Sequence, residues 1–347
     1  MIDKNSFDGG LVYGPKAFAE KTGRNKVWSA PAPPLYELAG RSCPNCGRLD
    51  AELLFYTKPR GGDLNVWDYH CCKACQMVYT RMAPTPKALA QMYGSGPSQQ
   101  EWVKLQQNEL EAGLDAAKFR WALEKAGWPF GNRRILDIGC STGSMLVVAD
   151  IMARPHKRFL GGVEINSAAL QTASARVGGD DFNCSVVIHD KLEVMKYLYE
   201  ECVPFKFDVV VLWEVLEHVL DPKTMLAEAW ELLAPGGIMI LCVPNWNSLA
   251  VRIMRERATC FGAGHLNFWC AETLLSLIQR TLTNNYDTRW LETIVSYAKE
   301  LTNYLNFREP MSEDVGDPSL MLPPVETIHR LLMGYKLVAW VRKGEEK

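Results

Sequence analysis

One short segment has the composition of a ligand-binding turn between a strand and a helix. An apolar run ends in the sequence Leu136-Asp137-Ile138-Gly139-Cys140-Ser141-Thr142-Gly143. The two glycines let the backbone approach a ligand closely, and the following helix N-terminus offers unpaired N–H groups. Asp137 would repel a pyrophosphate and suits a positively charged ligand. The spacing matches neither the dinucleotide fingerprint Gly-x-Gly-x-x-Gly nor the phosphate-binding Gly-x-x-x-x-Gly-Lys-Ser/Thr loop.

Four cysteines form two C-x-x-C pairs with the spacing of a structural zinc site. The pairs are Cys43/Cys46 and Cys72/Cys75, and 25 residues separate them. Four thiolates on two tight turns supply the tetrahedral ligands that Zn²⁺ prefers and leave no open position for catalysis. Cys71 precedes the second pair, so Cys71 could be the ligand in place of Cys72. A redox-active pair and four free buried thiols are the alternatives to zinc.

The elements that must position these residues alternate between two patterns from residue 133 onward. Apolar runs predict strands at 134–139, 159–165, 184–189, 207–213 and 238–243. Helical patterns lie between them at 142–152, 167–177, 192–199 and 222–233, and upstream at 86–93 and 99–128. A last strand is expected at 335–341. This alternation predicts an α/β fold with a doubly wound, mostly parallel sheet that helices cover on both faces.

Composition excludes several classes of protein. The 347 residues carry a net charge of −2, which disfavours nucleic acid as a partner. No apolar stretch approaches the roughly 18 residues of a membrane span, so no membrane association is expected. Eleven cysteines are an odd number for a disulfide framework, which favours a reducing, cytoplasmic location.

From about residue 133 to 269 the chain resembles the class I S-adenosylmethionine (SAM)-dependent methyltransferases. The turn described above is similar to the first motif of that family, with Ser141 where a second glycine is common. The resemblance implies a Rossmann-like methyltransferase fold with seven strands. It also implies that the turn binds the methionine part of SAM through Asp137, Gly139, Cys140, Ser141 and Gly143.

Further motifs follow in the order that the family shows. Glu164 lies 27 residues after Asp137 and is implied to bind the ribose hydroxyls, with Ile165 beside it. Asp190 is implied to lie near the adenine amino group. Trp213 could contact the sulfonium through its ring, or could simply pack in the core.

The same resemblance indicates where the chemistry would take place. In this fold the methyl group faces the carboxyl ends of the fourth and fifth strands, which points to Glu214, Glu217, His218 and His265. His218 is the expected general base, and a structural histidine at a helix start is the alternative. The Glu-x-x-Glu-His triplet also looks like the metal site of small-RNA 2′-O-methyltransferases and ubiquinone-pathway O-methyltransferases. Mg²⁺ is therefore a candidate cofactor, with His265 as a further ligand.

Zinc ribbons precede the methyltransferase domain in some bacterial enzymes that act on sugars, and this chain resembles that arrangement. We therefore expect a SAM-dependent methyltransferase whose acceptor is a small metabolite, with a sugar or nucleotide-linked sugar as the favoured class. The alternatives are a metal-dependent RNA 2′-O-methyltransferase and a non-catalytic SAM-binding or zinc-ribbon interaction module. O-, N- and C-methylation stay open, as does the oligomeric state.

Three segments are expected along the chain. Residues 1–40 form an N-terminal arm, residues 41–85 a small zinc-ribbon domain, and residues 86–347 the methyltransferase domain. An accessory insert is expected at about 297–334.

Overall fold

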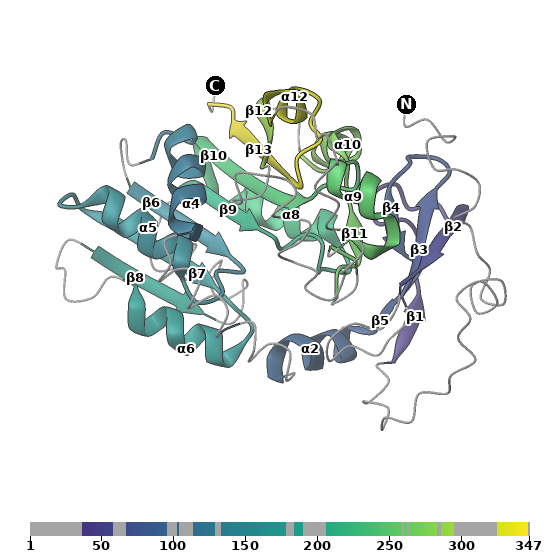
Figure 1. The fold of residues 1–347 in the computed structure, drawn as a ribbon. Coiled ribbons are helices and arrows are strands. Elements are labelled where there is room, and N and C mark those ends of the chain that lie inside the picture. Colours follow the sequence, from purple (N-terminus) through teal and green to yellow (C-terminus); the bar gives the residue numbers. More distant parts are fainter. Residues whose placement is uncertain are drawn as a thin grey trace.

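The computed structural model describes residues 37–57, 67–95, 103, 114–128, 133–177, 184–189, 206–258, 260–261, 264–282, 286–294 and 325–345. Their main feature is a seven-stranded sheet with helices on both faces, beside a smaller four-stranded sheet (Figure 1). Most of the expected arm and insert lie outside the described residues, as do Asp190 and the helix expected at 192–199.

The large sheet has the strand order β12-β13-β10-β9-β6-β7-β8. Its strands are β6 (Arg133–Ile138), β7 (Arg158–Val163), β8 (Cys184–His189), β9 (Phe207–Trp213), β10 (Leu233–Pro244), β12 (Tyr286–Ile294) and β13 (Lys336–Lys343). The five strands from β10 to β8 are parallel, and β13 is antiparallel to both β10 and β12. The predicted doubly wound, mostly parallel sheet is thus confirmed. Continuous apolar runs such as Val209–Leu212 form its central strands because both faces are buried.

Helices cover the two faces of this sheet. On one face lie α4 (Leu114–Lys125), α5 (Ser144–Ala153) and α6 (Ser167–Arg176), and on the other α8 (Pro222–Leu232) and α10 (Ala271–Thr281). Side-chain caps begin two of them: Asn166 accepts from two N–H groups of α6, and Asp221 from two of α8. Among the described residues, no helix is both long enough and apolar enough to cross a membrane. Shorter elements are α2 (Pro86–Ser95), α9 (Leu249–Met254), a 3₁₀ turn (Arg255–Arg257) and α12 (Val325–Arg330).

The small sheet joins the cysteine-rich segment to the rest of the chain. Its order is β11-β4-β3-β2, with β2 (Ala51–Tyr56), β3 (Asp68–Cys72) and β4 (Val78–Thr80) from the expected ribbon. The fourth strand, β11 (Asn267–Phe268), comes from much later in the sequence and pairs antiparallel with β4. A separate pair, β1 (Leu38–Gly40) with β5 (Met82–Pro84), completes this region. The sheet therefore crosses the expected boundary at residue 85.

Arg41 strengthens the same junction. Its guanidinium donates to the Leu266 carbonyl at 2.7 Å, to the Asn267 side-chain oxygen at 3.0 Å and to the Thr80 carbonyl at 2.9 Å. One ribbon side chain thus holds the segment that leads into β11.

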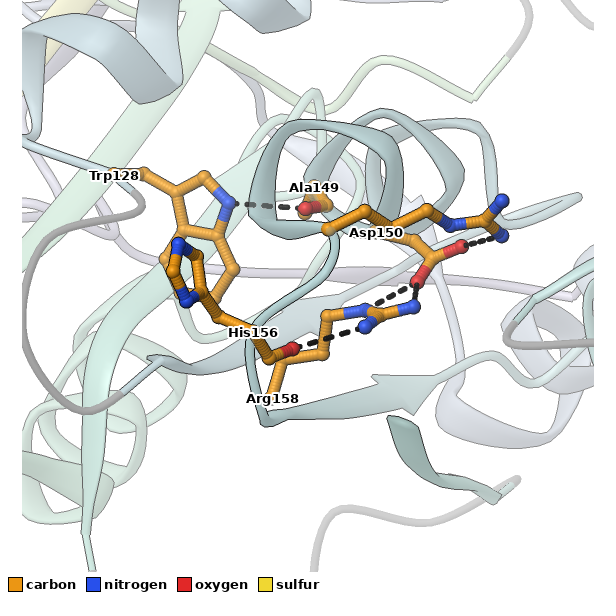
Figure 2. A network of polar contacts seen from close by, with 6 residues as sticks. Trp128, Ala149, Asp150, His156 and Arg158 are labelled. Carbon is orange, nitrogen blue, oxygen red and sulfur yellow. Dashed lines mark hydrogen bonds and ion pairs between the residues drawn. The ribbon is translucent and has the colours of Figure 1, made fainter. Parts of the chain in front are cut away.

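A buried ion-pair network stabilises the turn between α5 and β7 (Figure 2). Asp150, only 3% exposed, accepts from Arg158 and, at 2.6 Å, from Arg154. Arg158 also donates to the His156 carbonyl at 3.0 Å, and the Trp128 indole N–H donates to the Ala149 carbonyl at 3.1 Å. The network lies at the amino end of β7, away from the strand ends that carry the predicted site.

Replacing Asp150 by alanine is expected to lower the free energy of unfolding by about 3–5 kcal/mol, because it leaves the buried Arg158 guanidinium without its counter-ion. Asp50→Ala, which breaks an exposed pair with Lys73, is the matched control and should cost at most about 1 kcal/mol. Urea unfolding of both variants measures the difference. Equal losses would show that the buried network contributes no more than a surface pair.

Candidate active site

The glycine turn after β6 folds back against the end of β7. The N–H groups of Gly139 and Cys140 both donate to the Val163 carbonyl, at 2.7 and 2.9 Å. Gly139 has φ 76°, and a Cβ there would lie 2.5 Å from the Val215 side chain. Only glycine combines this positive φ with the absence of a Cβ that would collide with Val215. The turn after β6 and the segment after β9, which contains Val215, are therefore in direct contact.

Glu164 is held rigidly at the end of β7. One carboxylate oxygen accepts from the Ser141 N–H at 2.9 Å and the other from the Asn166 N–H at 2.7 Å. Burial raises the pKa of Glu164, and these backbone bonds offset part of that effect. Asp137 is 3% exposed, and burial followed by the charge of Glu164 raises its pKa well above the usual value. A buried and a half-buried acidic group at the carboxyl ends of β6 and β7 favour a ligand with hydroxyl donors and positive charge.

The other residues predicted to bind the cofactor lie around these two carboxyl groups. Cys140 is buried, Gly143 caps α5, and Ile165 is 55% exposed directly after Glu164. Trp213 ends β9 and meets the Phe119 ring edge-on at 5.3 Å. Its indole N–H has no hydrogen-bond partner within the described part of the chain. Asp190 lies outside the described residues, so its role stays a prediction.

Three of the predicted catalytic residues come together beyond the end of β9. Ligand atoms of Glu217, His218 and His265 all lie within 4.8 Å of one another. Glu217 and His218 follow β9, whereas His265 precedes β11. The Leu266 N–H donates to the Glu217 carbonyl at 2.7 Å, which fixes one segment against the other. The Asn267 side chain donates to the Leu216 and Val219 carbonyls at 2.8 and 2.7 Å.

Burial shifts the pKa of all three side chains in this group. Glu217 is fully buried, and neither carboxylate oxygen has a hydrogen-bond partner within the described residues. Burial, followed by the charge of Glu214, raises its pKa well above the usual value. Burial also lowers the pKa of His218 to about 3 and that of His265 to about 4. Both imidazoles are therefore neutral at pH 7 and offer a lone pair.

Glu214 occupies a different position from the other three. Lys336, at the start of β13, lies 2.5 Å from its carboxylate. Burial opposes ionisation of Glu214, but the charges of Lys336 and Lys118, with the hydrogen bond from Lys336, together outweigh burial and lower its pKa to about 2. Glu214 therefore forms an ion pair beside the group that Glu217 joins.

Sequence reasoning missed three residues of this region. Lys336 pairs with Glu214, Asn166 donates from its N–H to Glu164, and the Tyr93 hydroxyl lies 2.5 Å from Nδ1 of His218. Lys336 and Tyr93 are distant in the sequence from the motifs that they contact, and nothing in the local pattern marked them. Asn166 follows Glu164 closely and is the one that a helix-cap signal could have identified.

The four predicted zinc ligands also come together. Sγ of Cys43 lies 3.5 Å from that of Cys75, Sγ of Cys46 lies 3.5 Å from that of Cys72, and all four are within 4.8 Å. The two turns have the same backbone pattern, because the N–H four residues after the first cysteine of each pair donates back to its carbonyl at 2.8 Å. Cys71, the alternative ligand, is not in the group.

Comparisons with known proteins agree with this geometry. A family model described as a methyltransferase domain matches residues 99–281. Ubiquinone biosynthesis O-methyltransferase of Maricaulis maris is 37% identical over 122 residues, which are 35% of this chain and 44% of that protein. The enzyme of the same name from Neisseria meningitidis serogroup A is 30% identical over 116 residues, 33% of this chain and 46% of that protein. The matches thus span about half the length of these curated relatives.

A solved structure of the plantazolicin methyltransferase BamL, in complex with a triazolic desmethylPZN analog and SAH, is 17% identical. The superposition covers 74% of this chain and 94% of that chain with a TM-score of 0.48. The family match covers more than half of the chain and includes the turn after β6, Glu164 and the group around Glu217. This chain therefore belongs to the SAM-dependent methyltransferases.

Proposed function

We propose that this protein transfers the methyl group of SAM to a hydroxyl of a small metabolite, and that the acceptor is a sugar or nucleotide-linked sugar. The observation that carries this proposal is the group of buried Glu217 with half-buried His218 and His265, at the same carboxyl ends of the strands where Asp137 and Glu164 lie. The contact between Gly139 and Val215 joins the two sets of residues. The name that the curated relatives share, O-methyltransferase, agrees with a hydroxyl acceptor.

The cofactor side of the site follows from the acidic groups. Glu164 would accept hydrogen bonds from the ribose hydroxyls, as acidic residues do at this place in nucleotide-binding folds. Asp137 would face the ammonium group, and the backbone of Gly139, Cys140, Ser141 and Gly143 would surround the methionine part. Exposed Ile165 would cover one face of the adenine, and Trp213 would lie near the sulfonium.

The acceptor side needs orientation and a proton acceptor. In the reaction, the acceptor oxygen attacks the methyl carbon in line, the S–C bond breaks, and S-adenosylhomocysteine leaves. Neutral His218 would take the hydroxyl proton. The carboxyl group of Glu217, which has no hydrogen-bond partner among the described residues, would form a hydrogen bond with a second hydroxyl, because a buried polar group without a partner is costly. Two adjacent hydroxyls are a feature of sugars.

The same three side chains also fit a divalent cation. Glu217 supplies a carboxyl group that has no hydrogen-bond partner within the described ranges, and His218 and His265 supply neutral nitrogens. Two imidazoles and one carboxylate suit Mn²⁺, Fe²⁺ or Zn²⁺ better than Mg²⁺, which prefers oxygen ligands. Lewis acidity toward an acceptor hydroxyl is what such an ion supplies when bound. His218 would then be a ligand rather than the base.

His218→Gln is expected to lower kcat by at least about 100-fold, since it removes the proton acceptor or a metal ligand, and to leave the Kd for SAM within about twofold. The measurement is transfer of labelled methyl from SAM to a panel of nucleotide-linked sugars and catechols, with and without Mn²⁺. His156→Gln, on the exposed turn before β7, is the matched control. Full transfer by His218→Gln, or none by the unchanged protein to any acceptor, would contradict the proposal.

Glu164→Gln should weaken SAM binding by roughly 10–100-fold, because hydrogen bonds to a charged group contribute about 1.5–3 kcal/mol. Isothermal titration with SAM measures this change. Glu326→Gln, on exposed α12, should bind SAM as the unchanged protein does. Unaltered SAM affinity in Glu164→Gln would remove Glu164 from the cofactor site.

The four grouped cysteines complete the proposal as a structural Zn²⁺ site. Their separations agree with the roughly 3.8 Å between sulfurs in a tetrahedron of about 2.3 Å Zn–S bonds. Zn²⁺ there would hold both turns of the small sheet, and β11 would connect that sheet to the segment that bears His265.

Purified protein is expected to contain about one Zn²⁺ per chain, and Cys75→Ser to lose most of it, because one of four ligands is removed. Elemental analysis measures the zinc content. Cys71→Ser is the matched control, since this neighbouring thiol is outside the group and its loss should leave the metal in place. Zinc-free protein, or equal loss in both variants, would rule out this ligand set.

A further inference from the structure

Tyr93 connects the two halves of the site from outside the matched family segment. It lies near the end of α2, which Figure 1 shows between β5 of the ribbon region and α6 of the large sheet, and it precedes residue 99, where the family match begins. Its carbonyl accepts from the Asn166 side chain at 3.0 Å, next to Glu164. Its hydroxyl lies 2.5 Å from Nδ1 of His218 and 3.2 Å from the Gly264 carbonyl oxygen.

The protons among these three atoms can be assigned by counting donors. Nδ1 of His218 is itself 3.2 Å from the Gly264 carbonyl, so the hydroxyl, the ring nitrogen and the carbonyl are all mutual neighbours. A carbonyl only accepts, and the hydroxyl supplies one proton. If Nδ1 carried no hydrogen, the single hydroxyl proton would have to serve both the ring nitrogen and the Gly264 carbonyl. The lone pairs of those two acceptors would then face each other. With a hydrogen on Nδ1, Tyr93 donates to Gly264 and accepts from His218, and each atom has a partner.

We propose that Tyr93 is a positioning residue which, together with the Gly264 carbonyl, holds His218 in the tautomer with its hydrogen on Nδ1. The lone pair of the other ring nitrogen, Nε2, is thereby kept open toward the acceptor. Nε2 makes no hydrogen bond in the described part of the chain. The catalytic use of this lone pair rests on the proposed function, whereas the tautomer does not. A partner on one ring nitrogen is the usual means by which proteins select the free nitrogen of a histidine.

Gly264 is shaped to allow this contact. Its φ is +84°, and a Cβ on it would lie 2.5 Å from the Tyr93 hydroxyl oxygen. Glycine therefore gives the hydroxyl access to both the carbonyl and the ring. The Tyr93 and His218 rings meet edge-on at 71°, with centroids 5.4 Å apart, so the contact sets the orientation of the imidazole as well as its hydrogen.

The tautomer can be read directly by NMR of protein labelled with ¹⁵N-histidine, because protonated and unprotonated ring nitrogens have well-separated shifts. The chain has six histidines, and His218→Gln identifies the signals of His218. The expected spectrum at neutral pH shows hydrogen on Nδ1 and none on Nε2. A His218 ring with hydrogen on Nε2, or on both nitrogens, would overturn the proposal.

Tyr93→Phe tests the part that the hydroxyl plays. Its removal leaves only the 3.2 Å contact to Gly264, so the signals of His218 should shift toward a mixture of tautomers. With an acceptor that the unchanged protein methylates, kcat should fall about 10–100-fold while the Kd for SAM stays within about twofold. Tyr56→Phe, in β2 of the ribbon, is the matched control. Identical His218 signals in Tyr93→Phe and the unchanged protein would show that Tyr93 has no such role. Absence of methyl transfer by the unchanged protein would count against the proposed function alone.

Discussion

The pairing of the segment after β9 with β11 is the interaction on which the active site depends. The backbone carbonyl of Glu217 accepts from both the Leu266 and Asn267 N–H groups, and the Asn267 side chain donates to two further carbonyls of the same segment. These bonds hold His265 close to Glu217 and His218, together with the contacts of Tyr93 and His218 to the Gly264 carbonyl. They form because two polar backbone segments meet in a buried place, where every unpaired group is costly.

Because β11 is also the edge strand of the ribbon sheet, the ribbon is joined to the segment that carries His265. Three contacts hold the same short segment. β4 pairs with β11, the Arg41 guanidinium donates to the Leu266 carbonyl, and the Tyr69 hydroxyl donates to the His265 carbonyl at 3.3 Å. A metal at the ribbon turns would therefore stabilise the site at a distance and without contact with substrate. A four-sulfur site would in this way affect chemistry in which it takes no part.

The large sheet could be predicted because its strands are continuous apolar runs. The expected strands at 184–189 and 207–213 agree with β8 and β9. The turn after β6 could be predicted from its glycine motif. Edge strand β12 was missed because its apolar residues, Tyr286, Trp290, Leu291 and Ile294, do not alternate with polar ones. The helix expected to reach residue 128 ends at Lys125. The site was only partly predictable: the spacing of Glu214, Glu217 and His218 indicated a cluster, but not that Lys336 would pair with Glu214. Contacts such as Tyr93 with His218 join residues far apart in the chain, so no local pattern encodes them.

The burial of three acidic groups in one site has a consequence for how the protein is built. Asp137, Glu164 and Glu217 all lie where burial raises their pKa, and Glu217 lacks any donor among the described residues. Within the described residues, the burial of Glu217 is therefore offset by no hydrogen bond, whereas two backbone N–H groups offset part of the burial of Glu164. A cofactor and an acceptor bound as proposed would bring donors and positive charge to these groups, so that ligand binding would raise the free energy of unfolding. The bound ligands would in that case stabilise the fold in addition to reacting in it.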